Sequence, residues 1–79
     1  MQKVTYKVPA KRDDKGVFRL DESSKKEINR QELEPEEVQK GVEQIAIELG
    51  QKNQEDLELT KEIFNEPGSE GFVELTYLE

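Results

Sequence analysis

The clearest folding signal in this 79-residue chain is the stretch PEEVQKGVEQIAIELG, residues 35–50. Pro35 suits the first position of a helix, and the two glutamates after it suit the positive end of the helix dipole. Gly50 suits the residue that stops a helix. A narrow apolar stripe with helical spacing comprises Val38, Val42, Ile45 and Leu49. The sequence therefore predicts a helix over residues 35–49 that packs one face against a sheet.

The residues before this helix alternate between apolar and polar side chains, the pattern of a half-buried strand. This alternation covers residues 3–8, and Pro9 is expected to end the strand because it has no backbone N–H to donate. Residues 11–16 are rich in turn formers, and residues 17–20 fit a returning strand. The sequence predicts a β-hairpin over residues 3–20.

Two further segments leave alternatives open. Ser24 and Glu27 have the spacing of a capping box, so residues 21–34 fit either a short helix or a loop with one helical turn. Residues 55–64 fit a strand or a helix. We favour the strand because apolar and polar residues alternate from Leu57 onwards.

Apolar and polar residues alternate once more near the end of the chain. Residues 65–71 have the composition of a loop, and residues 71–78 are predicted to form a strand with Phe72 and Glu74 pointing outward. The elements together predict an α+β fold in a single domain, residues 1–79, with an approximate β-β-α-β-β order: a small, mostly antiparallel sheet covered by one main helix. The predicted core comprises Val4, Tyr6, Val8, Phe18, Leu20, Val38, Val42, Ile45, Leu49, Val73, Leu75 and Tyr77.

The charge is unevenly distributed along the chain. Twelve basic and 19 acidic residues give a net charge of −7. Residues 1–20 carry six basic and two acidic side chains, whereas residues 21–79 carry six basic and 17 acidic ones. An acidic surface favours basic partners and disfavours nucleic acid and anionic membranes. The alternative is that the acidic residues only keep a small protein soluble.

Several classes of function are disfavoured by composition. The chain has no His, Cys or Trp, so it lacks disulfides, thiolate or imidazole metal ligands and the usual general base at neutral pH. We expect no enzymatic activity, no cofactor, no metal site and no small-molecule substrate. No apolar run is long enough for a signal peptide or a membrane span, so we expect a cytoplasmic protein without membrane contact.

The basic N-terminal hairpin is the alternative site, because clustered lysines and arginines on one face are typical of small nucleic-acid binders. Its candidate residues are Lys3, Lys7, Lys11, Arg12 and Arg19. No outward aromatic in the hairpin offers a stacking platform, since Tyr6 and Phe18 point inward. Glu58, Glu62 and Glu74, in the last two predicted strands, would neutralise the same face. We therefore expect no nucleic-acid partner as the main function.

The outer face of the predicted helix is the favoured binding surface. At about 100° per residue, one apolar side chain falls among polar and acidic ones on the side opposite the stripe. The candidate partner-binding residues are Glu36, Lys40, Glu43, Gln44 and Ile47. Ile47 is expected to anchor a partner or a second copy, to pack beneath residues 21–34, or to be exposed without a role.

The sequence thus favours a small acidic, non-catalytic protein-binding or regulatory module that docks on a basic protein surface. One concrete version is a nucleic-acid mimic that inhibits a nucleic-acid-handling protein. The alternatives are a structural subunit or homodimer formed through a strand edge or Ile47, and a weak nucleic-acid binder that uses the hairpin.

Overall fold

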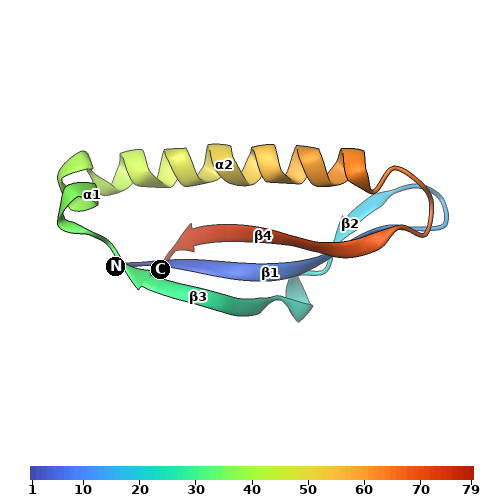
Figure 1. The fold of residues 1–79 in the computed structure, drawn as a ribbon, viewed down its shortest axis with the longest axis horizontal. Coiled ribbons are helices and arrows are strands. Elements are labelled where there is room, and N and C mark those ends of the chain that lie inside the picture. Colours follow the sequence, from blue (N-terminus) through green and yellow to red (C-terminus); the bar gives the residue numbers. More distant parts are fainter.

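The computed structural model describes all of residues 1–79 and shows an antiparallel sheet packed against one main helix (Figure 1). The elements in chain order are β1 (Gln2–Arg12), β2 (Phe18–Leu20), a 3₁₀ turn (Glu22–Ser24), β3 (Lys26–Glu32), α1 (Pro35–Lys40), α2 (Val42–Ile63) and β4 (Glu70–Leu78). The predicted α+β class is confirmed. Three strands precede the helix and one follows it, so the order is β-β-β-α-β.

Strand β1 is the centre of the sheet. Along one edge it pairs with β4, from Lys3 opposite Leu78 to Lys11 opposite Glu70. Its other edge is shared by β3 and β2, and all three pairings are antiparallel. β2 and β3 therefore run in the same direction, one after the other. The predicted hairpin over residues 3–20 is confirmed, and β3 extends it to residue 32.

Pro9 lies inside β1, so the prediction that it ends the strand is wrong. Alternate residues of β1 bond to β4: Gln2 donates its N–H to Glu79 and accepts one in return, at 2.8 and 2.9 Å. Pro9 belongs to the other set, whose backbone groups face β2 and β3. At Pro9 this edge of β1 faces the gap between the end of β2 and the start of β3. The Pro9 carbonyl accepts the Asp21 N–H at 2.9 Å. A residue without an N–H is tolerated in this central strand because its partner strand is interrupted at that point.

The interruption explains residues 21–34. Ala10 pairs with Leu20, yet Lys7 pairs with Lys26 instead of the residue that a regular ladder would place there. Between β2 and β3, the 3₁₀ turn at Glu22–Ser24 contains residues that have no partner in β1. Ile28 is a further unpaired residue, in a β-bulge. Both predicted forms of residues 21–34 are wrong, because only Glu22–Ser24 form a helical turn and Lys26–Glu32 form a strand. Strand β3 was not predicted because all seven of its residues are exposed, so it carries no apolar alternation.

The helical region differs from the prediction at both glycines. Gly41 has φ 97° and ψ 138°, a backbone conformation that side-chain-bearing residues rarely adopt, and the helix breaks there. The chain then continues as α2 straight through Gly50 to Ile63. The strand predicted at 55–64 is wrong, because α2 continues to Ile63. Leu59 and Ile63, which were assigned to a buried strand face, are 56% and 62% exposed on this helix.

The core is thin. Only seven of 79 residues are buried: Val4, Val8, Ala10, Ile45, Thr60, Val73 and Leu75. Tyr6, Phe18, Leu20, Leu57 and Phe64 pack around its centre as half-buried side chains, and Leu49 is half-buried as well. The predictions of Val38, Val42 and Tyr77 as core residues are wrong, since all three are exposed. The break at Gly41 turns Val38 out of line with the stripe of α2.

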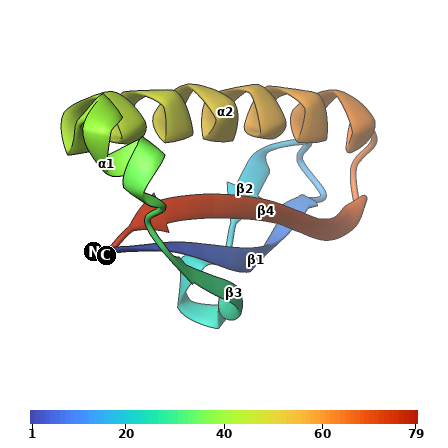
Figure 2. The same ribbon diagram turned by 60° about the vertical axis from the view of Figure 1, so that its left-hand side comes forward.

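Helix α2 runs alongside β4 and away from β3 (Figures 1 and 2). Asn53 makes this contact with its side-chain amide, which donates to the Thr76 carbonyl at 2.9 Å and accepts from the Thr76 N–H at 3.0 Å. Thr76 also shares a hydroxyl hydrogen bond of 2.8 Å with Thr5 across the strand pair. Asn53 thus pairs the outward backbone groups of Thr76, which would otherwise be unpaired on the edge of β4.

Candidate protein-binding surface

The five residues predicted to bind a partner are all exposed, but they do not form one helix face. Glu36 and Lys40 lie on α1, whereas Glu43, Gln44 and Ile47 lie on α2. The positive φ of Gly41 separates the two groups. No atom lies within 4 Å of the position a Cβ would occupy there, so glycine is required by the backbone conformation and not by close packing.

Ile47 is 54% exposed, so the alternative in which it packs beneath residues 21–34 is wrong. Most of that segment belongs to β3, which is separated from α2 by β1 and β4 (Figure 1). An exposed isoleucine on a helix of charged residues remains available for contact.

The residues of α2 that point to solvent can be identified from the residue that is buried. Thr60 faces inward, and residues about 180° from it at about 100° per residue point to solvent. We call this the outer strip, and every member is exposed. Its residues are Gln44, Ile47, Gln51, Glu55, Glu58 and Glu62. The helix is about 33 Å long at 1.5 Å per residue, so the strip is a long, narrow surface.

The strip carries negative charge that the protein does not neutralise. Helix α2 has six acidic and two basic side chains. Lys52 is 3.8 Å from Asp56, and Lys61 is 3.3 Å from Glu58. Lys40 reaches back from α1 to Glu48 at 3.2 Å. The carboxylates of α2 without an ion-pair partner are Glu55 and Glu62 within the strip and Glu43 at its side.

Two of the basic residues predicted as an alternative site are held by acidic neighbours. Lys3 Nζ lies 2.7 Å from Glu37 Oε2, and Arg19 Nε lies 3.0 Å from Asp13 Oδ2. The hydrogen bond from Lys3 lowers the pKa of Glu37 below its ordinary value, and the Glu34 N–H adds to this effect. The pKa of Asp13 is lowered first by the Val17 N–H and then by Arg19.

Arg12 has a structural role that the sequence analysis missed. Its guanidinium donates to the carbonyls of Phe64 at 2.5 Å and Lys61 at 2.7 Å, which lie at the C-terminal end of α2. It also donates to the Gly16 carbonyl at 3.1 Å and lies 5.5 Å from the centre of the Phe18 ring. Arg12 therefore caps the helix end, where cations are favoured. No local sequence pattern links the two, because they are about 50 residues apart.

Lys7 and Lys11 lie on the sheet face that α2 does not cover. Lys7 is opposite Glu74, which lies on this face as predicted, and the Lys7 Nζ lies 4.3 Å from the centre of the Phe72 ring. Glu58 and Glu62 are on α2, so the prediction that they neutralise this face is wrong. Phe72 is 56% exposed and supplies the outward aromatic that the hairpin lacks.

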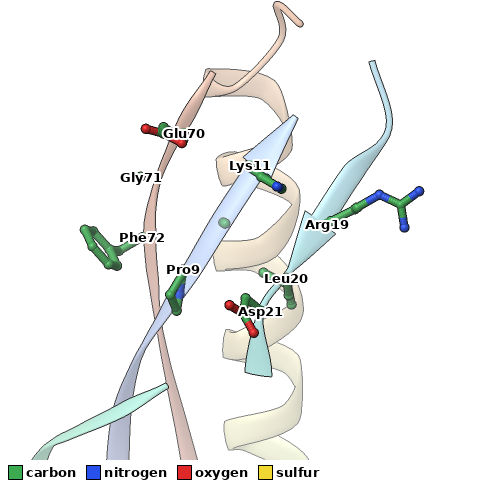
Figure 3. Close-up of a pocket in the computed structure, with 9 residues that line it drawn as sticks. Pro9, Lys11, Arg19, Leu20, Asp21, Glu70, Gly71 and Phe72 are labelled. Carbon is green, nitrogen blue, oxygen red and sulfur yellow. The ribbon is translucent and has the colours of Figure 1, made fainter. Parts of the chain in front are cut away.

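A shallow groove of about 670 Å³ lies beside Phe72 on this face (Figure 3). In Figure 3 the strands that carry the lining residues lie in front of the helix. Two cations, Lys11 and Arg19, and two carboxylates, Asp21 and Glu70, line it together with Pro9, Ala10, Leu20, Gly71 and Phe72. The opposite charges are equal in number, so the groove does not select for an anion.

None of the helices is both long and apolar enough to cross a lipid bilayer. No group of three or more acidic side chains is arranged to hold a metal ion. Comparison of the chain with protein-family models, curated proteins and solved structures finds no match.

Proposed function

We propose that this protein is a small acidic, non-catalytic binding module that docks on a basic surface of a protein partner through the outer strip of α2. The observation that carries this proposal is the set of unpaired carboxylates, Glu43, Glu55 and Glu62, on an exposed 22-residue helix. Isolated charges of this kind raise association rates with an oppositely charged partner.

Ile47 adds an apolar contact within this acidic surface. Protein interfaces combine a desolvated apolar centre with a charged rim, and Ile47 lies between Glu43 and Glu55 along the helix. Glu36 and Lys40 of α1 lie at one end of the strip and would contact a partner that extends beyond the first turn of α2. The proposed setting is the cytoplasm, in keeping with a chain that has no cysteine.

Nucleic-acid contact through β1 receives less support. Lys3, Arg12 and Arg19 are occupied by Glu37, by the end of α2 and by Asp13. Freeing them would break contacts that hold α1, α2 and the β1–β2 turn in place.

The experiment is capture of partners from a nuclease-treated lysate on the immobilised protein, with elution in steps from about 0.05 to 1 M salt. We compare the wild type with the double variant Glu55→Lys/Glu62→Lys. The matched control is Asp14→Lys/Glu66→Lys, which makes the same change in net charge at exposed positions outside α2.

A partner that binds the wild type and the control, elutes at intermediate salt and is lost with the α2 variant supports the proposal. Equal retention by all three proteins, or equal loss from both variants, contradicts it. If the captured protein is displaced by added DNA or RNA, the module acts as a nucleic-acid mimic.

A further inference from the structure

Two tyrosines on the core face of the sheet remain partly open to solvent. Tyr77 pairs with the buried Val4, and Tyr6 is two residues further along β1, so both rings lie on the face that carries the core. The ring centres are 6.2 Å apart, and the ring planes are tilted by 51°. Tyr77 is 39% exposed, and Tyr6 is half-buried. We call Tyr6 and Tyr77 the tyrosine pair.

A cation of the chain already lies on this surface. The Lys25 ammonium is 4.5 Å from the centre of the Tyr6 ring, a distance at which the ring attracts a positive charge. None of the ion pairs in the structure includes Lys25, although the chain has 19 acidic residues. Lys25 is exposed and lies between the 3₁₀ turn and β3. Its side chain can therefore leave the ring without disturbing a helix or strand.

The charges around the tyrosine pair are mainly negative. The Tyr6 hydroxyl donates to Glu79, and this hydrogen bond raises the pKa of Tyr6. Burial raises the pKa of Tyr77, and the charge of Glu22 adds to this effect. Apart from Lys25, the charged groups that act on the two rings are three carboxylates and one guanidinium: Glu22, Glu27, Glu79 and Arg30. These surroundings favour a second cation if Lys25 moves away.

We propose that the tyrosine pair is a binding site for a lysine side chain of a protein partner, and that Lys25 occupies this site in the free protein. The rings attract the ammonium group, and the neighbouring carboxylates supply the opposite charge. Methylation keeps the charge of a lysine, and aromatic rings are the usual binding surface for quaternary ammonium groups. Trimethyl-lysine should therefore bind more tightly than lysine.

Phe72 provides a comparison within the same molecule. Lys7 lies 4.3 Å from the centre of the Phe72 ring, so this ring also holds a lysine of the chain. Phe72 has no second aromatic ring beside it, whereas Tyr6 and Tyr77 lie together. A lysine from outside should therefore affect the tyrosine pair more than Phe72.

The site goes beyond the proposed function and does not depend on it. The tyrosine pair belongs to the sheet, whereas the outer strip belongs to α2. The two surfaces can be altered separately, so one can fail while the other holds.

The test is titration of the isotope-labelled protein with N-acetyl-lysine amide and with its ε-trimethyl and ε-acetyl forms, at constant ionic strength. NMR follows the ring ¹H–¹³C signals of Tyr6, Tyr77 and Phe72. We expect the trimethyl form to shift the tyrosine signals with a Kd of about 10 mM and the unmodified form to bind more weakly. The ε-acetyl form has lost the charge and should not bind. The Phe72 signals should change less than those of the tyrosines.

Four variants test the residues of the site, and circular dichroism establishes that each is folded. Lys25→Ala should tighten binding about threefold or more, because the internal competitor is lost. Lys15→Ala removes the same charge in the β1–β2 turn and is the matched control. Tyr77→Leu should weaken binding about fivefold or more, whereas Tyr77→Phe keeps the ring and should retain most of the affinity.

Several results would overturn the proposal. One is a set of tyrosine signals that do not shift up to about 100 mM of the trimethyl form, and another is equal binding of the trimethyl and ε-acetyl forms. Binding to Lys25→Ala that is no tighter than to Lys15→Ala, or binding to Tyr77→Leu as tight as to Tyr77→Phe, would also overturn it. Glu55→Lys/Glu62→Lys should leave the titration unchanged, which separates this result from the capture experiment on α2.

Discussion

Replacing Arg12 with alanine should destabilise the protein by about 2–3 kcal/mol. Its guanidinium holds two carbonyls at the end of α2, Lys61 at 2.7 Å and Phe64 at 2.5 Å. Hydrogen bonds from charged donors contribute about 1.5–3 kcal/mol, and a half-buried site puts the set near the lower end of that range. The interaction of the cation with the helix dipole adds about 0.5 kcal/mol.

This loss is large for so small a protein, because a domain of this length has a total stability of about 4–12 kcal/mol. The assay is urea unfolding followed by circular dichroism. With a denaturant dependence of about 1 kcal/mol per molar urea, the midpoint should fall by about 2 M.

Two further variants separate the cap from a general effect of charge. Arg12→Lys keeps the cation but loses the planar fork, so we expect roughly half of the destabilisation. Lys11→Ala, at the exposed neighbouring position, should change stability by about 0.5 kcal/mol or less. The reasoning is refuted if Arg12→Ala costs no more than Lys11→Ala, or if Arg12→Lys is as stable as the wild type.

Gly50→Ala should raise stability by about 0.5–1 kcal/mol, because Gly50 is inside α2 with open space around it. Gly41→Ala should lower stability by about 1 kcal/mol or more, because the backbone φ at Gly41 is 97°. Thermal melts in which both variants shift the melting temperature in the same direction would contradict this. Asn53→Ala should cost about 1–2 kcal/mol and speed amide exchange at Thr76, whose N–H and C=O it leaves unpaired; unchanged exchange there would show that Asn53 does not cover the β4 edge. Glu37 and Asp13 have lowered pKa values in the folded protein, so each stabilises it above the ordinary carboxyl pKa, and that contribution is lost as the pH falls through the lowered value. Urea midpoints between about pH 6 and pH 2 should therefore decline less steeply in Glu37→Gln than in the wild type, and parallel curves would count against the Lys3–Glu37 pair.

The sequence predicts those elements whose burial follows a simple period. Val4, Val8, Val73 and Leu75 alternate in their strands, and all four are buried. Strand β3 shows no such period because both of its faces are exposed. Residues 55–64 fit both the two-residue period of a strand and the 3.6-residue period of a helix. The apolar residues Leu59 and Ile63 favoured the strand, although both are exposed on α2.

The candidate surface was predicted in part for a similar reason. Exposure of Glu43 and Ile47 follows from helical spacing alone. The separation of Glu36 and Lys40 from them depends on one backbone angle at Gly41, and a glycine within a helical pattern fits either a break or a continuation. The role of Arg12 depends on a contact between distant segments, which no local pattern encodes.

The central position of β1 determines the order in which the sheet can be completed. β1 is the first strand of the chain, yet its longest pairing is with β4, the last, about 70 residues later. A chain emerging from the ribosome can form the β1–β2–β3 hairpin early, but Val4, Val8 and Ala10 then have neither α2 nor β4 over them. The sheet is complete only once β4 has been made and has paired with β1. Folding is therefore governed by long-range closure and should be slow for a domain of this size.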